Sequence, residues 1–347
     1  MTPRERVLCA LSHQEPDRTP RDFWAEPASL ARLSAHLRLR DEEAILERFR
    51  IDLRRLSARE PPDRDTGGGV YENRWGERYV LRSTPWGPVR DDLPGALSAA
   101  TADADRFPWP SVDDVDHRPL RDQAHRWPAH ALLYGFADVW QRPALVRGWE
   151  PFFADMVERP ELVHSLCARF VAYYREDYAQ AQEAAGGRID LFLLISDLGS
   201  QRGPLISMTM FREFVAPHLR AMVDRIHELG ARVLFHSCGD IAVFIDDLVA
   251  IGIDALDPIQ PVGEGMAPEA LRRRTAGRLC LHGGIDMQRV LTQGSPDEVR
   301  REVRRYLDTF RGGGYILSPA HLFQPDVPPA NIVAMYDEAD RQEGGGF

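Results

Sequence analysis

Apolar runs alternate regularly with helical stretches along the chain from residue 129 onward. Each run is short enough for one buried strand, and a longer segment with apolar residues at helical spacing follows it. Parallel strands need such crossover helices, so this order predicts a parallel sheet. The runs span residues 129–136, 189–196, 231–237, 253–259, 278–284 and 314–320.

These strand–helix units, with one or two more in the earlier part of the chain, approach the number in a closed (β/α)8 barrel. A doubly wound open sheet is the alternative, but its nucleotide-binding form needs a glycine-rich loop after the first strand. No such loop follows the first run. We therefore predict a single α/β barrel domain of the (β/α)8 TIM class over residues 1–347.

The first third of the chain departs from this pattern. Residues 2–13 are predicted to form a helix, with Thr2 as its cap and Pro3 at its first position, and residues 28–50 also have a helical pattern. Residues 60–110 place the segment VYENRWGERYVLRSTPWGPV between loops rich in proline and glycine. This composition predicts a small β-hairpin insertion that covers one end of the barrel.

Composition limits the partners of the chain. The formal net charge of −10 argues against a nucleic-acid surface, which needs clustered lysine and arginine. No apolar run approaches the roughly 20 residues of a membrane span, and the N-terminal segment lacks the apolar core of a signal peptide. We expect a cytoplasmic protein that binds a small-molecule substrate, with no nucleic acid and no membrane as partner; a homodimer stays open.

Polar residues stand at or just after the ends of the predicted strands. Residues in these positions of a barrel meet at one face, where active sites of such barrels lie. The set comprises Asp138, Asp197, His236, Cys238, Gln260, Asp286 and His321.

The segment RVLFHSCGDI ends its apolar run with His236 and Cys238. Residues two apart on a strand point to the same side, and imidazole nitrogen and thiolate sulfur are preferred zinc ligands. The segment SPAHLFQPDVPP brings His321 to the end of the last predicted strand as a third ligand. The alternatives are an ordinary strand end for His236 and Cys238, and a helix cap or a buried, hydrogen-bonded side chain for His321.

Several further residues are candidates for contacts with a substrate. Asp197 suits a general acid or base, or a substrate anchor, and otherwise a helix cap. Gln260, Asp286 and Gln324 would hold polar substrate groups, unless loop hydrogen bonds satisfy them. Tyr134 and Trp140 would form an aromatic wall, although such residues commonly pack in a core.

Five segments together resemble the uroporphyrinogen decarboxylase superfamily across nearly the whole chain. That superfamily has the (β/α)8 barrel fold, so the resemblance agrees with the alternation of strands and helices. The segments span residues 2–20, 203–240, 253–261, 282–291 and 312–339.

The superfamily divides by chemistry, and the chain is more similar to one branch. True decarboxylases carry an Arg-rich N-terminal motif close to R-Q-A-G-R, whereas residues 18–30 read RTPRDFWAEPASL and lack it. The other branch contains zinc-dependent methyltransferases that work with corrinoid proteins and carry H-x-C on one strand and a Cys at the end of the last strand. His236 and Cys238 match that motif, and His321 stands where the branch has Cys.

The resemblance therefore implies a zinc-dependent methyltransferase with His236, Cys238 and His321 as metal ligands. A methyl group would pass between a small-molecule substrate and a corrinoid, on a partner protein, or another one-carbon carrier, with His236 and Asp197 in catalytic roles. The alternatives are a decarboxylase of a tetrapyrrole or small carboxylate, another zinc-dependent lyase or hydrolase, and a binding protein for a tetrapyrrole or corrinoid without turnover.

Overall fold

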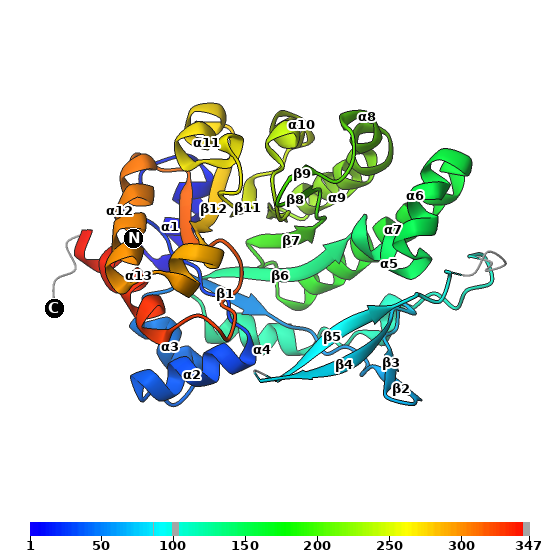
Figure 1. Cartoon of the computed structure of the whole chain (residues 1–347), viewed down its shortest axis with the longest axis horizontal. Coiled ribbons are helices and arrows are strands. Elements are labelled where there is room, and N and C mark those ends of the chain that lie inside the picture. Colours follow the sequence, from blue (N-terminus) through cyan, green and yellow to red (C-terminus); the bar gives the residue numbers. More distant parts are fainter. Residues whose placement is uncertain (86, 99–103, 343–347) are drawn as a thin grey trace.

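A parallel sheet of seven strands curls around the centre of the molecule (Figure 1). The computed structural model describes residues 1–85, 87–98 and 104–342. The six predicted apolar runs form six of these strands, whereas β1 reads LRRL, and each strand pairs in parallel with the next. In spatial order the strands are β1 (Leu53–Leu56), β6 (Ala131–Asp138), β7 (Leu191–Ile195), β10 (Arg232–His236), β11 (Ala255–Ile259), β12 (Cys280–Ile285) and β13 (Tyr315–Pro319).

An extended segment, residues 20–25, fills the gap between the two edge strands of this sheet. On one side, the Asp22 amide donates to the carbonyl of Leu317 in β13 at 2.9 Å. On the other side, the Asp52 amide, just before β1, donates to the Arg21 carbonyl at 2.9 Å. The predicted α/β barrel is therefore confirmed. Residues 20–25 close it in the place of an eighth strand.

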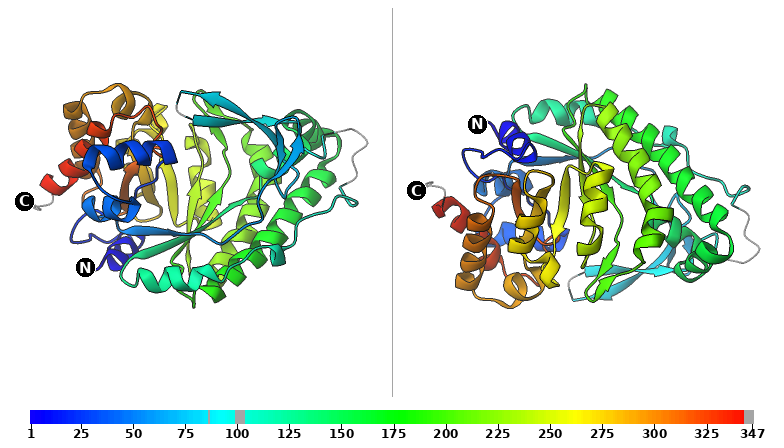
Figure 2. Two further views of the ribbon diagram at one scale, coloured as in Figure 1. Left: turned by 90° about the horizontal axis from the view of Figure 1, so that it is seen from below. Right: turned by 90° about the horizontal axis from the view of Figure 1, so that it is seen from above.

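Helices cover the outside of the curled sheet in both views of Figure 2. None of the helices within the described ranges is long and apolar enough to cross a membrane. They are α1 (Pro3–Leu11), α2 (Pro27–Leu37), α3 (Glu42–Arg48), α4 (Pro119–Arg126), α5 (Gln141–Arg147), α6 (Trp149–Glu158), α7 (Pro160–Ala184), α8 (Met208–Met210), α9 (Ala216–Glu228), α10 (Ile245–Ile251), α11 (Pro268–Thr275), α12 (Pro296–Thr309) and α13 (Pro329–Gln342).

The first helix closes the N-terminal end of the barrel. Thr2 and Glu5 form a reciprocal capping box, which satisfies two backbone amides at the start of α1. Val7 and Leu11 of this helix are buried in one cluster with inward-facing strand residues such as Leu53. A larger apolar core separates the sheet from the outer helices. The polar residues of the candidate site therefore lie at the opposite end of the barrel, at the C-terminal ends of the strands.

The predicted insertion is a sheet of four antiparallel strands rather than a single hairpin. It lies beside the strand ends of the barrel, below β6 in Figure 1. Residues 86 and 99–103 of the predicted range 60–110 lie outside the described residues. The strands are β2 (Arg64–Gly67), β3 (Val70–Glu72), β4 (Arg78–Thr84) and β5 (Gly87–Leu93), and a short hairpin of β8 (Gly199–Ser200) and β9 (Gly203–Pro204) follows β7.

Gly135 allows β6 to change register against β7. Its φ is +97°, and a Cβ at this position would collide with the buried Tyr178 ring. We expect Gly135→Ala to lower the free energy of unfolding by about 2–4 kcal/mol, because a left-handed backbone and overpacking are both unfavourable for alanine. Gly186→Ala is the matched control: its φ is +65° but nothing lies near its Cβ, so about 1 kcal/mol is expected. Urea unfolding measures both, and equal losses would contradict the steric argument.

Candidate metal and substrate site

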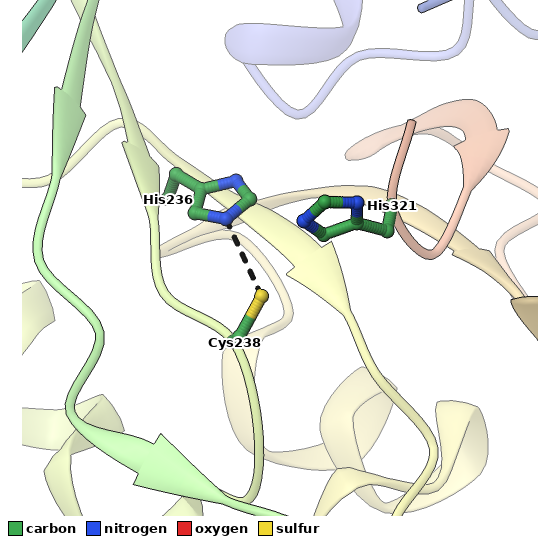
Figure 3. Close-up of side chains that lie close together, drawn as sticks. All are labelled: His236, Cys238 and His321. Carbon is green, nitrogen blue, oxygen red and sulfur yellow. Dashed lines mark hydrogen bonds between the residues drawn. The ribbon is translucent and has the colours of Figure 1, made fainter. Parts of the chain in front are cut away.

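The three predicted metal ligands lie together at the C-terminal end of the barrel (Figure 3). His236 ends β10, Cys238 follows two residues later, and His321 lies two residues beyond β13. Their ligand atoms all lie within 4.8 Å of one another, and Cys238 Sγ is 3.4 Å from His236 Nε2. We call these three residues the His-Cys-His cluster.

The donor set of this cluster fits a zinc ion. Two donor atoms at the corners of a zinc tetrahedron lie roughly 3.5 Å apart, close to the separation of Cys238 Sγ and His236 Nε2. Three protein ligands leave one tetrahedral position open, as in catalytic rather than structural zinc sites. The chemistry and the spacing of the residues are therefore both compatible with a zinc ion.

Asp257 in the middle of β11 orients His236. Its Oδ2 lies 2.6 Å from His236 Nδ1, which leaves Nε2 directed at Cys238. The two residues are direct neighbours in the register of β10 and β11. Metal-binding histidines usually donate their other ring nitrogen to a carboxylate in this way, which fixes the ring and raises its basicity.

Behind Asp257, a buried chain of charged groups continues through the barrel. Asp257 Oδ1 lies 2.6 Å from His282 Nδ1, and His282 Nε2 lies 3.1 Å from Asp22 Oδ2. Arg55 then donates two hydrogen bonds of 2.8 Å to the two oxygens of Asp22. The closing segment and strands β1, β10, β11 and β12 are thus joined behind the cluster.

Neighbouring charges set the protonation of the two cluster histidines differently. Burial favours neutral His236, but the Asp257 carboxylate and the Cys238 sulfur outweigh it and raise the pKa of His236 well above its ordinary value. Burial lowers the pKa of His321, and the charge of His236 lowers it further. Without a metal, the cluster therefore pairs a cationic His236 with a neutral His321.

His282 makes the folding stability of the metal-free protein depend on pH. Burial opposes its charge, but Asp257 and Asp22 outweigh burial and raise the pKa of His282 from 6.5 to about 9. This raised pKa contributes stability that is fully present below about pH 6.5 and is lost as the pH rises through about 9. We expect a loss on the order of 3 kcal/mol across this window, measured by urea unfolding in the presence of a chelator. The free energy of unfolding of His282→Gln should fall less than that of the unaltered chain across this pH window. An equal fall in both proteins would show that His282 carries no charge.

Asp197 and Gln260 hold the loop that carries Cys238. Asp197 Oδ1 accepts from the Cys238 amide at 2.8 Å, and Gln260 Oε1 accepts from the Gly239 amide at 2.5 Å. Asp197 Oδ1 also lies 4.0 Å from His236 Nε2, and Gln141 donates to its other oxygen at 3.0 Å. Asp197 is therefore beside the cluster, as a catalytic or anchoring role requires.

Other predicted substrate residues have different surroundings. Asp286 caps the turn after β12 by accepting from the amides of Gln288 and Arg289, and it shares a cavity with Gln260. Gln324 is half-buried, and no hydrogen bond within the part of the chain that the structure describes involves its side chain.

Trp140 does not lie in a substrate wall. It is fully buried and packs against Phe152 with ring centroids 5.2 Å apart, so the prediction for Trp140 is corrected to a core role. Asp138, two residues earlier, is a helix cap that accepts from the amides at the start of α5. Tyr134, in contrast, lines a cavity, and its role in an aromatic substrate wall stays a prediction.

Sequence reasoning assigned no role to the residues behind the cluster. Asp257 and His282 are polar residues inside neighbouring apolar strands, which was a usable signal, but their pairing depends on strand register. Trp24 was also missed, and its indole stacks on the His321 ring with centroids 6.4 Å apart. No pattern near residue 24 indicated that the segment closes the barrel beside the last strand.

Comparisons with known proteins agree with this architecture. The family model for uroporphyrinogen decarboxylase (URO-D) matches residues 143–342. Uroporphyrinogen decarboxylase from Chlorobium phaeovibrioides is 26% identical over 51% of this chain and 48% of its own length. The enzyme of the same name from Xanthomonas euvesicatoria is 29% identical over 50% of this chain and 48% of its own length. The chain thus spans about half the length of the curated relatives it matches.

A solved structure resembles the whole chain in fold. A methyltransferase from Methanosarcina mazei superposes with a TM-score of 0.71 and covers 99% of each chain, at 17% sequence identity. At this identity the likeness concerns the fold alone.

Proposed function

Because the chain belongs to the uroporphyrinogen decarboxylase (URO-D) family, we propose that its His-Cys-His cluster makes it a zinc-dependent methyltransferase of that family. It would move a methyl group between a small-molecule substrate and a corrinoid, carried by a partner protein, or another one-carbon carrier. The observation that carries this proposal is the convergence of His236, Cys238 and His321 within 4.8 Å at the end of the barrel where such enzymes react.

The residues around the cluster have distinct tasks in this proposal. His236, Cys238 and His321 hold the metal, and Asp257 fixes the His236 ring through Nδ1. Zinc bound there supplies a Lewis acid that favours the deprotonated form of an acceptor thiol or hydroxyl. Asp197, 29% exposed and beside the cluster, takes the proton that the acceptor loses.

Methyl transfer then needs positioning more than further acid–base chemistry. The methyl carbon forms a bond to the acceptor atom while its bond to the donor breaks, and the bonding electron pair stays on the donor. Gln260 and Asp286 face one cavity beside the cluster, where they would bind polar groups of the substrate.

Decarboxylation is the second candidate function, since the curated relatives carry that name. The arginines that remain in the N-terminal segment argue against it. Arg18 pairs with the buried Asp52 at 2.8 Å, and the Arg21 side chain is fully buried and pairs with Asp340 at 2.7 Å. Both therefore have structural partners and are not available to bind substrate carboxylates.

Zinc content and methyl transfer together test the proposal. The purified chain should contain one zinc ion, measured by mass spectrometry of the metal. With methylcobalamin as donor and a small thiol as acceptor, it should accelerate loss of the cobalt–carbon chromophore. Chelation should abolish this rate and added zinc should restore it. A protein that neither contains nor binds zinc, or release of carbon dioxide from uroporphyrinogen without metal, would overturn the proposal.

A further inference from the structure

A cavity of about 440 Å³ lies between the barrel and the inserted sheet, and Trp24 in its lining stacks on His321 of the His-Cys-His cluster. Arg74 reaches it from the loop between β3 and β4, and Arg142 reaches it from the start of α5. Both guanidinium groups lie over the Trp75 ring, at 5.3 Å and 5.7 Å from its centroid. Two arginines from distant parts of the sequence therefore both contact one indole.

These arginines have buried donors without acceptors. Arg74 Nε and Nη1 and Arg142 Nε have no hydrogen-bond partner within the described ranges, although Arg74 also donates from Nη2 to the Tyr173 hydroxyl. The nearest carboxylate oxygens stay outside hydrogen-bond geometry: Glu60 lies 3.8 Å from Arg74 Nε and Glu77 lies 3.4 Å from Arg142 Nε. Unpaired buried donors are unfavourable, so both guanidinium groups would gain from turning these N–H groups toward an acceptor that enters the cavity.

An aromatic wall connects the cavity to the metal ligands. Trp24 and Phe136 both line the cavity and meet edge to face, with ring centroids 6.4 Å apart. Phe136 is 50% exposed although it is a large apolar residue, and Trp24 stacks on His321. A flat apolar body that covered this wall would remove Phe136 from water and extend from the arginines toward the cluster.

The charges around the cavity favour a singly charged ligand. Arg55 also lines it, but both of its terminal nitrogens are hydrogen-bonded to Asp22. Among the described residues, Arg74 and Arg142 have only long ion pairs, with Glu60 at 3.8 Å and with Glu77 at 3.4 Å, and these two arginines are better placed to exchange a partner for a ligand. Two carboxylates, Glu60 and Asp177, line the same cavity and weaken its positive potential. A carboxylate with one charge fits this balance better than a phosphate with two.

We propose that Arg74 and Arg142 form a carboxylate-binding subsite, and that the small-molecule substrate is a carboxylate with a planar apolar body lying along Trp24 and Phe136. This inference rests on the proposed function, because it places the reacting end of that substrate at the His-Cys-His cluster. The forked guanidinium group binds a carboxylate through two parallel hydrogen bonds, which fixes the orientation of the rest of the molecule.

Titration calorimetry with benzoate and benzamide tests the subsite. The two probes share a planar ring and differ in charge, and the full-length chain with its zinc content verified is used for both. Benzoate should bind at least about 10-fold more tightly than benzamide and than inorganic phosphate. Arg74→Met and Arg142→Met should each weaken benzoate binding about 10-fold or more without changing zinc content, and Arg142→Lys should recover part of the loss.

Arg82→Met is the matched control. Arg82 lies on the same inserted sheet, is exposed and pairs with Asp91, so its replacement should leave benzoate binding unchanged. Equal binding of benzoate and benzamide, absence of benzoate binding up to about 10 mM, or full binding by both cavity variants would overturn the subsite. The comparison of probes on the unaltered chain holds even where a variant fails to fold.

The readouts separate this inference from the proposed function. Zinc binding and methyl transfer to uncharged thiols, without any preference for carboxylates, would contradict the carboxylate subsite and still support the proposed methyltransferase function. Charge-dependent benzoate binding in a chain that binds no zinc and transfers no methyl group would support the subsite and contradict the proposed methyltransferase function.

Discussion

Replacing Cys238 with alanine should abolish stoichiometric zinc binding and methyl transfer. The sulfur is one of three ligand atoms within 4.8 Å, and the rest of the His-Cys-His cluster offers only two imidazoles. A complete ligand set binds zinc with a free energy on the order of 10 kcal/mol or more. Loss of one ligand should therefore weaken the affinity for zinc at least about 100-fold. Competition against a chromophoric chelator measures the affinity, and the rate of methyl transfer should fall by a similar factor.

Cys9→Ala supplies the control for this experiment. Cys9 is also a free, half-buried cysteine, but it lies on α1 at the opposite end of the barrel. The replacement of Cys9 should leave zinc content and the rate of methyl transfer unchanged. With metal removed from both proteins, Cys238→Ala should unfold at nearly the same urea concentration as the unaltered chain. Full zinc occupancy in Cys238→Ala would show that the cluster is not the metal site.

Replacing Asp52 with alanine should cause the largest loss of stability outside the site. This carboxylate is completely buried and accepts from Arg6 at 2.6 Å, from Arg18 at 2.8 Å and from the Arg21 amide at 2.8 Å. It therefore holds the first helix and the closing segment against the start of β1. Removing one partner of a buried ion pair leaves uncompensated charge, and we expect the free energy of unfolding to fall by about 3–5 kcal/mol.

An exposed ion pair provides the comparison. Asp308 pairs with Arg311 at 2.7 Å, but both side chains are more than half exposed, so Asp308→Ala should change stability by less than about 1 kcal/mol. Urea unfolding at neutral pH measures both variants. A loss below 1 kcal/mol in Asp52→Ala would show that the barrel closes without this cluster of charges.

The position of the His-Cys-His cluster followed from the sequence because it depends on local pattern. His236 ends β10, Cys238 follows two residues later and His321 lies two residues beyond β13, and parallel strands end at one edge of the sheet, which brings the three residues to the same end of the barrel. The alternation of apolar runs and helices likewise predicted the α/β barrel, because each run is buried on both faces. These are properties of single elements and of the order in which they occur.

Only the tertiary structure decided which groups stand behind and beside the ligands. Asp257 meets His236 because β10 and β11 pair in one register, and a shift by one residue would turn that carboxylate to the other face. The closing segment, residues 20–25, has no strand pattern and is held by backbone hydrogen bonds to β13 and to Asp52. Trp140 lies in the core because Phe152 packs on it.

The cavity arginines illustrate the same division. Arg74 belongs to an inserted sheet and Arg142 to a helix after β6, and nothing in their local sequence relates one to the other. Packing on the shared ring of Trp75 brings them together. Local periodicity therefore determined the barrel and the end that carries the His-Cys-His cluster. Contacts between residues distant in sequence decided the surroundings of that cluster, because register and side-chain packing are set only when the elements meet.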